Sequence, residues 1–294
     1  MSVKSKLLNL MNKTGYRYMY LLARYFNERL LYRVSVSRYK ENFILKGGSL
    51  LYALNGLETR PTIDVDFMAQ DISNDKSHLE KVFGEILSVK CEEDGVSFDV
   101  TGMKSEPITV DNQYPGTRLS ITAHLDTIVF PLTIDIGFGD VVVPSPIEID
   151  YPLLLSGIPD IMLNAYSIEM VIAEKFHTMI VRDVNNSRMK DFFDCYILLT
   201  TNKLDESILF DAVKATFDNR GLLYNPDLQL FKPSFFKDMS RITRWENFLR
   251  KIHWKEDVQF EDVMTVINNN LLHIYDKYWN DKKRNVGNDL LYNK

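Results

Sequence analysis

Two aspartates separated by one residue are the clearest candidates for chemistry in this sequence. Asp64 and Asp66 lie in the run from Thr62 to Met68, where alternating apolar residues predict a strand. Side chains at positions i and i+2 of a strand share a face, so both carboxylates would reach the same one or two hard cations. Mg²⁺ is held in proteins by a few carboxylates together with substrate phosphates. The alternative is a half-exposed strand with a polar face.

A second strand repeats this geometry. The run from Leu132 to Phe138 alternates in the same way and carries Asp135 on its polar side. If the two strands are neighbours, Asp135 becomes a third carboxylate beside the first two. It would either bind a metal or accept the proton of an attacking hydroxyl.

A glycine pair precedes these strands at Lys46-Gly47-Gly48-Ser49 and is followed by apolar residues. The glycines allow the backbone to approach a ligand closely, and Ser49 is expected to open a helix. A helix N-terminus presents unpaired N–H groups and the positive end of its dipole, which favours a phosphate. The alternative is a simple turn.

Positive charges come from the second half of the chain. Residues 167–182 have apolar residues at helical spacing, and Lys175 falls within the apolar stripe. A lysine there requires a negative partner or a position at the edge of the core. We expect a phosphate or an acidic group beside Lys175, with Arg182 two turns further along the same helix.

The next segment contains Arg188, Lys190, Asp191 and Asp194. On a helix, Arg188 and Asp191 are i,i+3 neighbours, and Lys190 and Asp194 are i,i+4 neighbours. These charges either form local ion pairs or contribute to a site.

The elements around these residues predict an α+β protein. Residues 1–40 have helical periodicity, short alternating runs extend from about residue 43 to 149, and helical patterns return from about residue 167. We expect two domains: residues 1–160, with a basic helical arm at the N-terminus, and a helical domain of residues 161–294.

Composition places the chain among ordinary globular proteins, with 45% hydrophobic and 26% charged residues in 294. Two cysteines cannot build a disulfide framework, so a reducing cytoplasm is the expected setting. The sequence has neither a signal-peptide pattern nor a run of about 20 apolar residues, and we expect no membrane association.

The charge is distributed unevenly. Residues 1–40 hold nine basic residues against one acidic residue, Glu28, although the whole chain carries −5. Residues 220–255 are also basic and contain Trp245, Phe248 and Trp254. Basic residues among aromatic residues suit RNA, whose unstacked bases can lie on rings. The alternative for each segment is a solvated helix face.

Taken together, these motifs resemble the AbiEii toxin family of the DNA polymerase β-like nucleotidyltransferase superfamily. The resemblance covers about residues 40 to 200. It rests on the Gly47-Gly48-Ser49 turn, the run Arg60-x-Thr62-x-Asp64-x-Asp66, Asp135, Lys175 and Arg188-x-Lys190-Asp191-x-x-Asp194. It implies a small mixed sheet flanked by helices, with helical extensions at both ends.

The resemblance also implies residue roles. Asp64, Asp66, Lys175 and Asp191 would be catalytic, and Asp64, Asp66 and Asp135 would hold Mg²⁺ or Mn²⁺. The remaining candidates would contact the NTP; they are Lys46, Gly47, Gly48, Ser49, Arg60, Thr62, Arg182 and Lys190.

The implied function is that of a toxin from a toxin–antitoxin pair that acts in phage defence. It would transfer a nucleotide from an NTP to RNA, with the tRNA 3′ end as the expected acceptor, and a cognate antitoxin encoded nearby would be its partner. Two alternatives remain open: a toxin that binds NTP without transfer, and transfer to a small molecule or a protein. RNA binding should weaken steeply with salt, whereas transfer to a small molecule should not.

Overall fold

The computed structural model describes residues 2–56, 59–110 and 114–292, which form two compact units. The first unit is Met1–Asp140 with Pro146–Tyr166, and the second is Val141–Ser145 with Ser167–Lys294. We expected a division after residue 160; the compact units divide between Tyr166 and Ser167. The predicted α+β class is confirmed, because a seven-stranded mixed sheet is flanked by helices.

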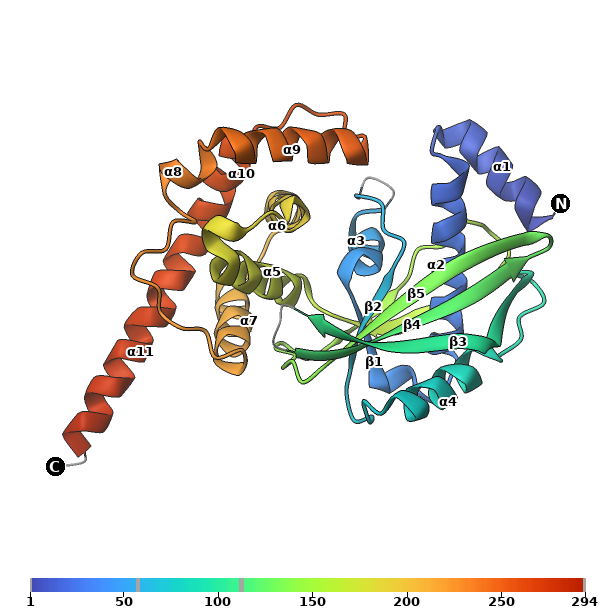
Figure 1. The fold of residues 1–294 in the computed structure, drawn as a ribbon, viewed down its shortest axis with the longest axis horizontal. Coiled ribbons are helices and arrows are strands. Elements are labelled where there is room, and N and C mark those ends of the chain that lie inside the picture. Colours follow the sequence, from blue (N-terminus) through green and yellow to red (C-terminus); the bar gives the residue numbers. More distant parts are fainter. Residues whose placement is uncertain (1, 57–58, 111–113, 293–294) are drawn as a thin grey trace. The chain divides into compact units, whose positions relative to one another are not determined.

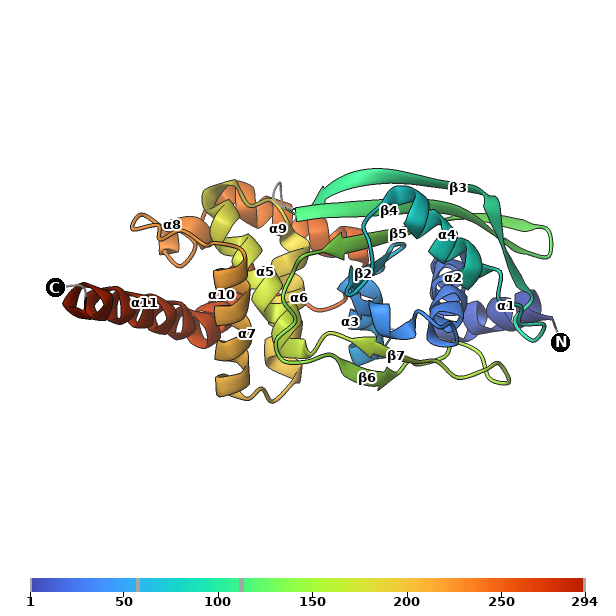
Figure 2. The same ribbon diagram turned by 90° about the horizontal axis from the view of Figure 1, so that it is seen from below.

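The first unit contains the whole sheet and four helices among its described residues (Figures 1 and 2). The helices are α1 Val3–Thr14, α2 Tyr18–Ser35, α3 Gly47–Asn55 and α4 Lys76–Leu87, and a short 3₁₀ turn covers Lys40–Asn42. The strands are β1 Phe43–Lys46, β2 Val65–Ala69, β3 Val96–Val110, β4 Tyr114–Leu125, β5 Ile128–Phe138, β6 Ile147–Asp150 and β7 Met162–Ala165.

The strands lie in the order β3-β4-β5-β2-β1-β7-β6. Strand β2 pairs in parallel with β5, β1 pairs in parallel with β7, and the other neighbours are antiparallel. One face of the sheet packs on helices: Phe26 of α2 stacks on Phe130 of β5, and Phe83 of α4 contacts Phe43 of β1. The alternation in β2 and β5 therefore turns their polar residues, including the aspartates, to the other face.

The strand around the paired aspartates is shorter than predicted. Strand β2 begins at Val65, and Ile63 is 60% exposed, so the expected strand from Thr62 is wrong at its start. The pairing explains the difference: β1 ends at Lys46, opposite Asp66, and the chain then turns into α3. No β1 residue remains to pair with Thr62 or Asp64.

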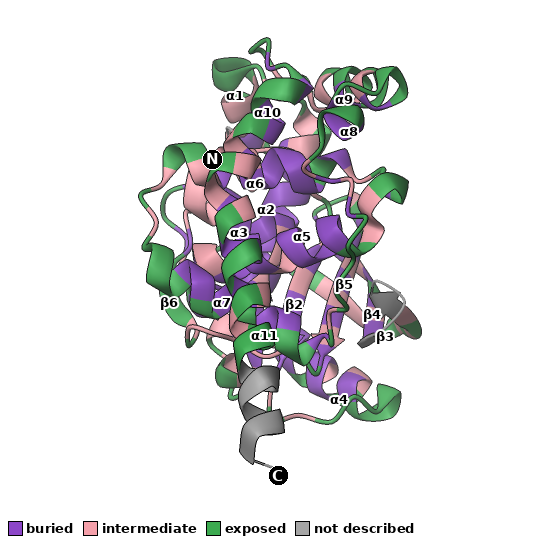
Figure 3. Ribbon diagram, turned by 90° about the vertical axis from the view of Figure 1, so that its left-hand side faces the viewer, coloured by how far each residue is buried: buried purple, intermediate pink, exposed green. Residues whose placement is uncertain are grey.

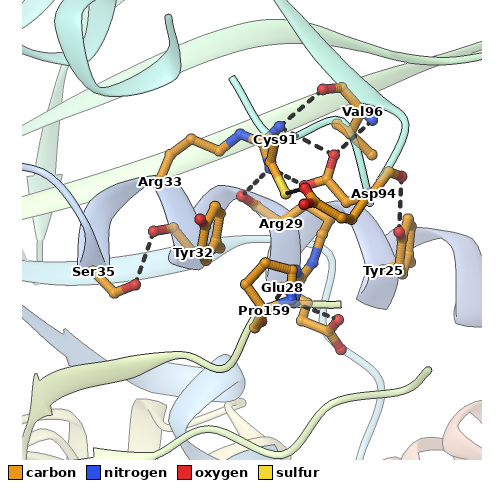
Figure 4. Close-up of polar contacts among 11 residues, drawn as sticks. Tyr25, Glu28, Arg29, Tyr32, Arg33, Ser35, Cys91, Asp94, Val96 and Pro159 are labelled. Carbon is orange, nitrogen blue, oxygen red and sulfur yellow. Dashed lines mark hydrogen bonds and ion pairs between the residues drawn. The ribbon is translucent and has the colours of Figure 1, made fainter. Parts of the chain in front are cut away.

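Helix α2 carries an unusual set of buried charges (Figure 4). Arg33 forms an ion pair with Asp94, and its guanidinium also donates to the Val96 carbonyl at 2.9 Å. Asp94 accepts the Val96 amide at 2.8 Å, and both charged side chains are fully buried. Because a buried charge is tolerated only when it is paired and hydrogen-bonded, this set holds α2 to the start of β3.

A second buried pair lies beside the first on the same helix (Figure 4). Glu28 accepts from Arg29 at 2.8 Å and from the Leu154 amide at 2.7 Å. Burial raises the pKa of Glu28 to about 7, against the lowering effect of Arg29. Arg29 in turn donates to the Pro159 carbonyl at 3.5 Å. These bonds join α2 to the segment that precedes β7.

These contacts correct the prediction that residues 1–40 present nine basic side chains to a polyanion. Three of the nine are buried in the interior of the first unit; they are Arg24, Arg29 and Arg33. Two further cations bind carboxylates at the surface: Arg38 pairs with Glu85, and Lys40 pairs with Glu148. The exposed basic residues that remain belong to α1 and the residues just after it; they are Lys4, Lys13 and Arg17, with Lys6 half-buried.

The second unit is helical. Its helices are α5 Ile168–Arg182, α6 Met189–Thr201, α7 Glu206–Asn219, α8 Pro233–Phe236, α9 Met239–Ile252, α10 Phe260–Ile267 and α11 His273–Tyr292, with a 3₁₀ turn at Asp183–Asn185 and a π-helical turn at Asn268–Leu272. Helices α5 and α6 are largely buried (Figure 3). Within the described residues of the whole chain, we find no helix both long and apolar enough to cross a bilayer.

Of the three aromatic residues in the second basic segment, Trp245 belongs to the core and is not available to stack on bases, whereas Phe248 and Trp254 are half-buried. Trp245 is 1% exposed, its ring packs on Phe260, and its indole N–H donates to the Val258 carbonyl at 2.7 Å. Trp254 and Phe248 both pack edge-on against Phe193 of α6. Burial of Trp245 within the second unit thus explains the ring that is closest to complete burial.

We predict that Asp94→Ala destabilises the protein by about 3–5 kcal/mol, because the Arg33 charge stays buried without its main partner. Urea unfolding followed by circular dichroism measures this change. Glu85→Ala is the matched control, since it breaks the exposed pair with Arg38 and should have little effect. Equal losses in the two variants would contradict this role for the buried pair.

Candidate functional site

The glycine turn is packed directly against one of the paired aspartates. Gly47 has φ +65°, and a Cβ atom there would lie 2.0 Å from the Asp66 carboxylate oxygen Oδ2. A Cβ on Gly48 would lie 2.6 Å from the Cβ of Thr62. Both glycines are therefore required by close approach, and Gly47 also by its backbone conformation.

Helix α3 begins at this turn rather than at Ser49. Its first residue is Gly47, and Lys46 is the N-cap, so the expectation that Ser49 opens the helix is wrong. Ser49 is fully buried, and its hydroxyl donates to the Asp64 carbonyl oxygen at 3.2 Å. Ser49 thus fixes the start of α3 to the segment that carries the aspartates.

That segment is held by side chains rather than by a strand ladder. The Thr62 hydroxyl also donates to the Asp64 carbonyl, at 3.4 Å, and the Asn27 amide of α2 donates to the Ile63 carbonyl at 3.2 Å. Asp64 and Asp66 are both half-buried, as are Arg60 and Thr62. The backbone of the aspartate pair is therefore fixed, while the carboxylates remain accessible to solvent.

The strand register places four charged residues in one row across the sheet. Asp66 of β2 lies opposite Lys46 of β1 on one side and opposite Asp135 of β5 on the other. Arg118 of β4 lies opposite Asp135. Directly opposed residues share a face, so the charges run in the order Lys46, Asp66, Asp135 and Arg118. Strands β2 and β5 are therefore neighbours, which is the condition under which the sequence placed Asp135 beside the paired aspartates.

The row contains one bidentate ion pair. Arg118 Nε lies 2.7 Å from Asp135 Oδ1, and Arg118 Nη2 lies 2.7 Å from Oδ2. The hydrogen bonds that Arg118 donates to Asp135 raise the pKa of Arg118, and Asp64 adds to this through its charge. Lys46, at the opposite end of the row, has its ammonium 5.2 Å from the ring centroid of Tyr166.

The donor set fits a hard divalent cation. Among the described residues, no group of three or more His, Cys, Asp or Glu side chains is gathered as a metal site. Mg²⁺ needs no such group, because one or two carboxylates and substrate phosphates commonly hold it. Asp64 and Asp66 supply two half-buried carboxylates, one of them in close contact with the helix turn at Gly47.

The second unit holds its own charged cluster. Lys175 of α5 has its ammonium 2.7 Å from Asp194 Oδ2 and 3.3 Å from Asp191 Oδ1, both on α6. Arg188 pairs with Asp191 at 2.5 Å, which confirms the predicted i,i+3 contact. Both aspartates are only 2% exposed, and Lys175 is 12% exposed. Of the two partners expected beside Lys175, a phosphate or an acidic group, the structure contains the acidic group.

The two cations keep Asp191 ionised. Burial favours its neutral form, but Lys175 and Arg188 outweigh burial and lower the pKa of Asp191 to about 2. Lys190 is exposed, and Arg182 at the end of α5 is half-buried. The roles predicted for these residues in nucleotide handling remain predictions.

Sequence reasoning missed Arg118. It lies in an alternating run that predicts a strand, but nothing local distinguishes it from any other solvent-facing arginine. Its importance follows from register, which brings it opposite Asp135 on a strand that begins ten residues later along the chain. The alternation alone could place Arg118 and Asp135 on polar faces, but not opposite each other.

A mixed sheet with half-buried paired aspartates beside a glycine turn is the arrangement expected of a nucleotidyltransferase. Residues 29–266 match the family model described as nucleotidyl transferase AbiEii toxin, type IV toxin–antitoxin system. This match spans most of the chain, which therefore belongs to the AbiEii nucleotidyltransferase toxin family, as the motifs predicted.

Two solved structures align with most of the chain. A protein of H. pylori described as a candidate nucleotidyltransferase aligns with a TM-score of 0.51 at 12% identity, over 90% of this chain and 98% of its own. JHP933 from Helicobacter pylori aligns with a TM-score of 0.49 at 15% identity, over 91% of this chain and 97% of its own. No curated protein matches the sequence significantly.

Gly47→Ala tests the close approach of the turn to Asp66. We expect the variant to lose nucleotide transfer and to be less stable than Gly15→Ala, as measured by urea unfolding and by transfer of labelled nucleotide. Gly15 is the matched control because its φ is +74° and a Cβ there meets no atom within 4 Å. The control therefore isolates the backbone strain, of about 1–2 kcal/mol, from the contact with the carboxylate. Equal behaviour of the two variants would contradict the packing role.

Asp191→Asn tests the ionised cluster of the second unit. Because the folded pKa of Asp191 is about 2, below its value of 3.8 in the unfolded chain, its ionisation stabilises the protein fully above pH 4. This contribution is about 2 kcal/mol and disappears as the pH falls through about 2. The melting temperatures of wild type and variant should therefore converge between pH 4 and pH 2. A gap that stays constant over this range would show that Asp191 is not held ionised by its neighbours.

Proposed function

We propose that this protein transfers a nucleotide from an NTP to an RNA acceptor, with the tRNA 3′ end as the expected target, and that a divalent metal ion assists. The observation that carries the proposal is the packing of Gly47 against the Asp66 carboxylate. This packing supports the proposal because it brings the Asp66 carboxylate to the N-terminus of helix α3, where a metal ligand and a phosphate-binding turn are both needed.

In the proposed reaction, an acceptor hydroxyl attacks the α-phosphorus of the NTP and pyrophosphate leaves. Asp64 and Asp66 would hold Mg²⁺ or Mn²⁺, which when bound neutralises charge on the triphosphate. Gly47 and Gly48 would let the backbone N–H groups of the turn approach the phosphates. Ser49 and Thr62 would keep the Asp64 backbone in place through the bonds to its carbonyl oxygen.

The remaining predicted site residues enter the proposal through the family positions that they occupy. Lys46, Arg60, Arg182 and Lys190 are the candidate contacts to the NTP. Lys175 and Asp191 are the candidate catalytic residues of the second unit, where each is held by an opposite charge. Lys175 and Arg188 hold the pKa of Asp191 low, which keeps this carboxylate ionised.

The choice of RNA as acceptor rests on a smaller basic surface than the sequence indicated. Lys4, Lys13 and Arg17 remain exposed around α1, and α1 contains no acidic residue. A surface with this charge suits a phosphate backbone. The family further indicates a cognate antitoxin as the protein partner. The cytoplasm is the expected location of both.

Asp66→Asn should abolish the transfer of label from an α-³²P NTP to total RNA in the presence of Mg²⁺, with a loss of at least about 10³-fold. Each of the four NTPs is tested in turn, and the labelled RNA is resolved by size. Asp126→Asn is the matched control: it makes the same change on an exposed residue in the turn between β4 and β5, and it should transfer normally.

The other outcomes of this experiment separate the alternatives. If Asp66→Asn still transferred label to the RNA, the assignment of Asp66 to the metal site would be wrong. NTP binding without any labelled product would indicate a toxin that acts by occupancy, and label on a small molecule or protein would identify a different acceptor. Transfer to RNA should also fall steeply between 50 and 200 mM salt.

A further inference from the structure

The row of charges contains an electrostatic conflict at its centre. Asp66 and Asp135 lie directly opposite each other on neighbouring parallel strands, with Cα atoms about 4.8 Å apart, and their side chains share a face. Two carboxylates in this arrangement repel each other unless cations compensate them. A cation shared by both, or a separate cation for each, would remove the repulsion.

For Asp135, the structure contains a separate cation, which is the guanidinium of Arg118. Arg118 engages both carboxylate oxygens at 2.7 Å, and Asp135 is only 17% exposed. A bidentate arginine pair of this kind is geometrically specific and stronger than a single contact. Asp64 and Glu106 also act on Arg118 through their charges.

We propose that Arg118 is a positioning residue that keeps Asp135 out of the metal-binding set. The ion is then held by Asp64 and Asp66 alone, and its other coordination positions stay open for the triphosphate. This inference rests on the proposed function. It assigns to Asp135 the role of a fixed, charge-compensated neighbour rather than that of a third ligand.

The physical reason is that a third free carboxylate would bind the ion too well in the absence of substrate. Mg²⁺ in phosphoryl-transfer sites keeps few protein ligands, because phosphate oxygens and water occupy the others. Removal of the Arg118 charge would also strengthen the negative potential around Asp64 and Asp66. Arg118 would therefore make metal binding depend on the NTP.

The experiment measures Mn²⁺ binding without nucleotide, by the loss of the free-ion signal in electron paramagnetic resonance. Arg118→Met should tighten Mn²⁺ binding by about tenfold or more, because Asp135 becomes available as a ligand. Arg118→Met combined with Asp135→Asn should return the affinity to within about threefold of wild type, since the pair is removed without a change of net charge. Arg118→Lys should lie close to wild type.

Arg38→Met is the matched control, since it makes the same replacement at an exposed ion pair and releases Glu85. It should leave the Mn²⁺ affinity unchanged. Circular dichroism confirms the fold of each variant. The double variant tests the inference even if Arg118→Met alone does not fold.

Unchanged or weaker Mn²⁺ binding in folded Arg118→Met would overturn the inference. So would a tenfold loss of affinity in the double variant, because Asp135 would then be a ligand in the wild-type protein. Asp66→Asn separates this failure from a failure of the proposed function. If Asp66→Asn binds Mn²⁺ as tightly as wild type, the metal site itself is misassigned. If Asp66→Asn loses Mn²⁺ binding, the metal site holds, and a contrary result for Arg118→Met overturns only the role of Arg118.

Discussion

The first unit depends on the compensation of like charges that its own sheet brings together. Parallel pairing of β2 with β5 gives the sheet its buried face, with Phe67 opposite Ile136, and the same register sets Asp66 beside Asp135 on the other face. The apolar contacts cannot form without the acidic contact. Arg118 compensates Asp135, and Lys46 lies opposite Asp66 on the other side.

Two kinds of constraint act on the acidic pair. The backbone around Asp64 is held by hydroxyls from Ser49 and Thr62, and Gly47 packs against the Asp66 side chain. In the second unit, the ammonium of Lys175 pairs with Asp191, and Lys175 and Arg188 hold the pKa of Asp191 low.

Much of this could be predicted from the sequence, because alternation and helical periodicity depend on local burial. The strand of Asp135 and the helix of Lys175 were predicted correctly, and an acidic group was one of the two partners expected for that lysine. The errors came from tertiary contacts. Arg33 was expected at the surface because it lies in a basic segment. It is buried because it pairs with Asp94, which lies far along the chain. Trp245 likewise read as a base-stacking residue until the helices of the second unit covered it. The pairing of Arg118 with Asp135 could not be predicted, because the register between two strands is not set by the local sequence pattern.

The most direct test of the account is a crystal structure of the protein with Mn²⁺ and a non-hydrolysable NTP analogue, in which anomalous scattering locates the ion. The account predicts Mn²⁺ bound by Asp64 and Asp66 together with phosphate oxygens, while Asp135 remains paired with Arg118. An ion bound away from both aspartates, or bound by Asp135 with Arg118 displaced, would contradict it.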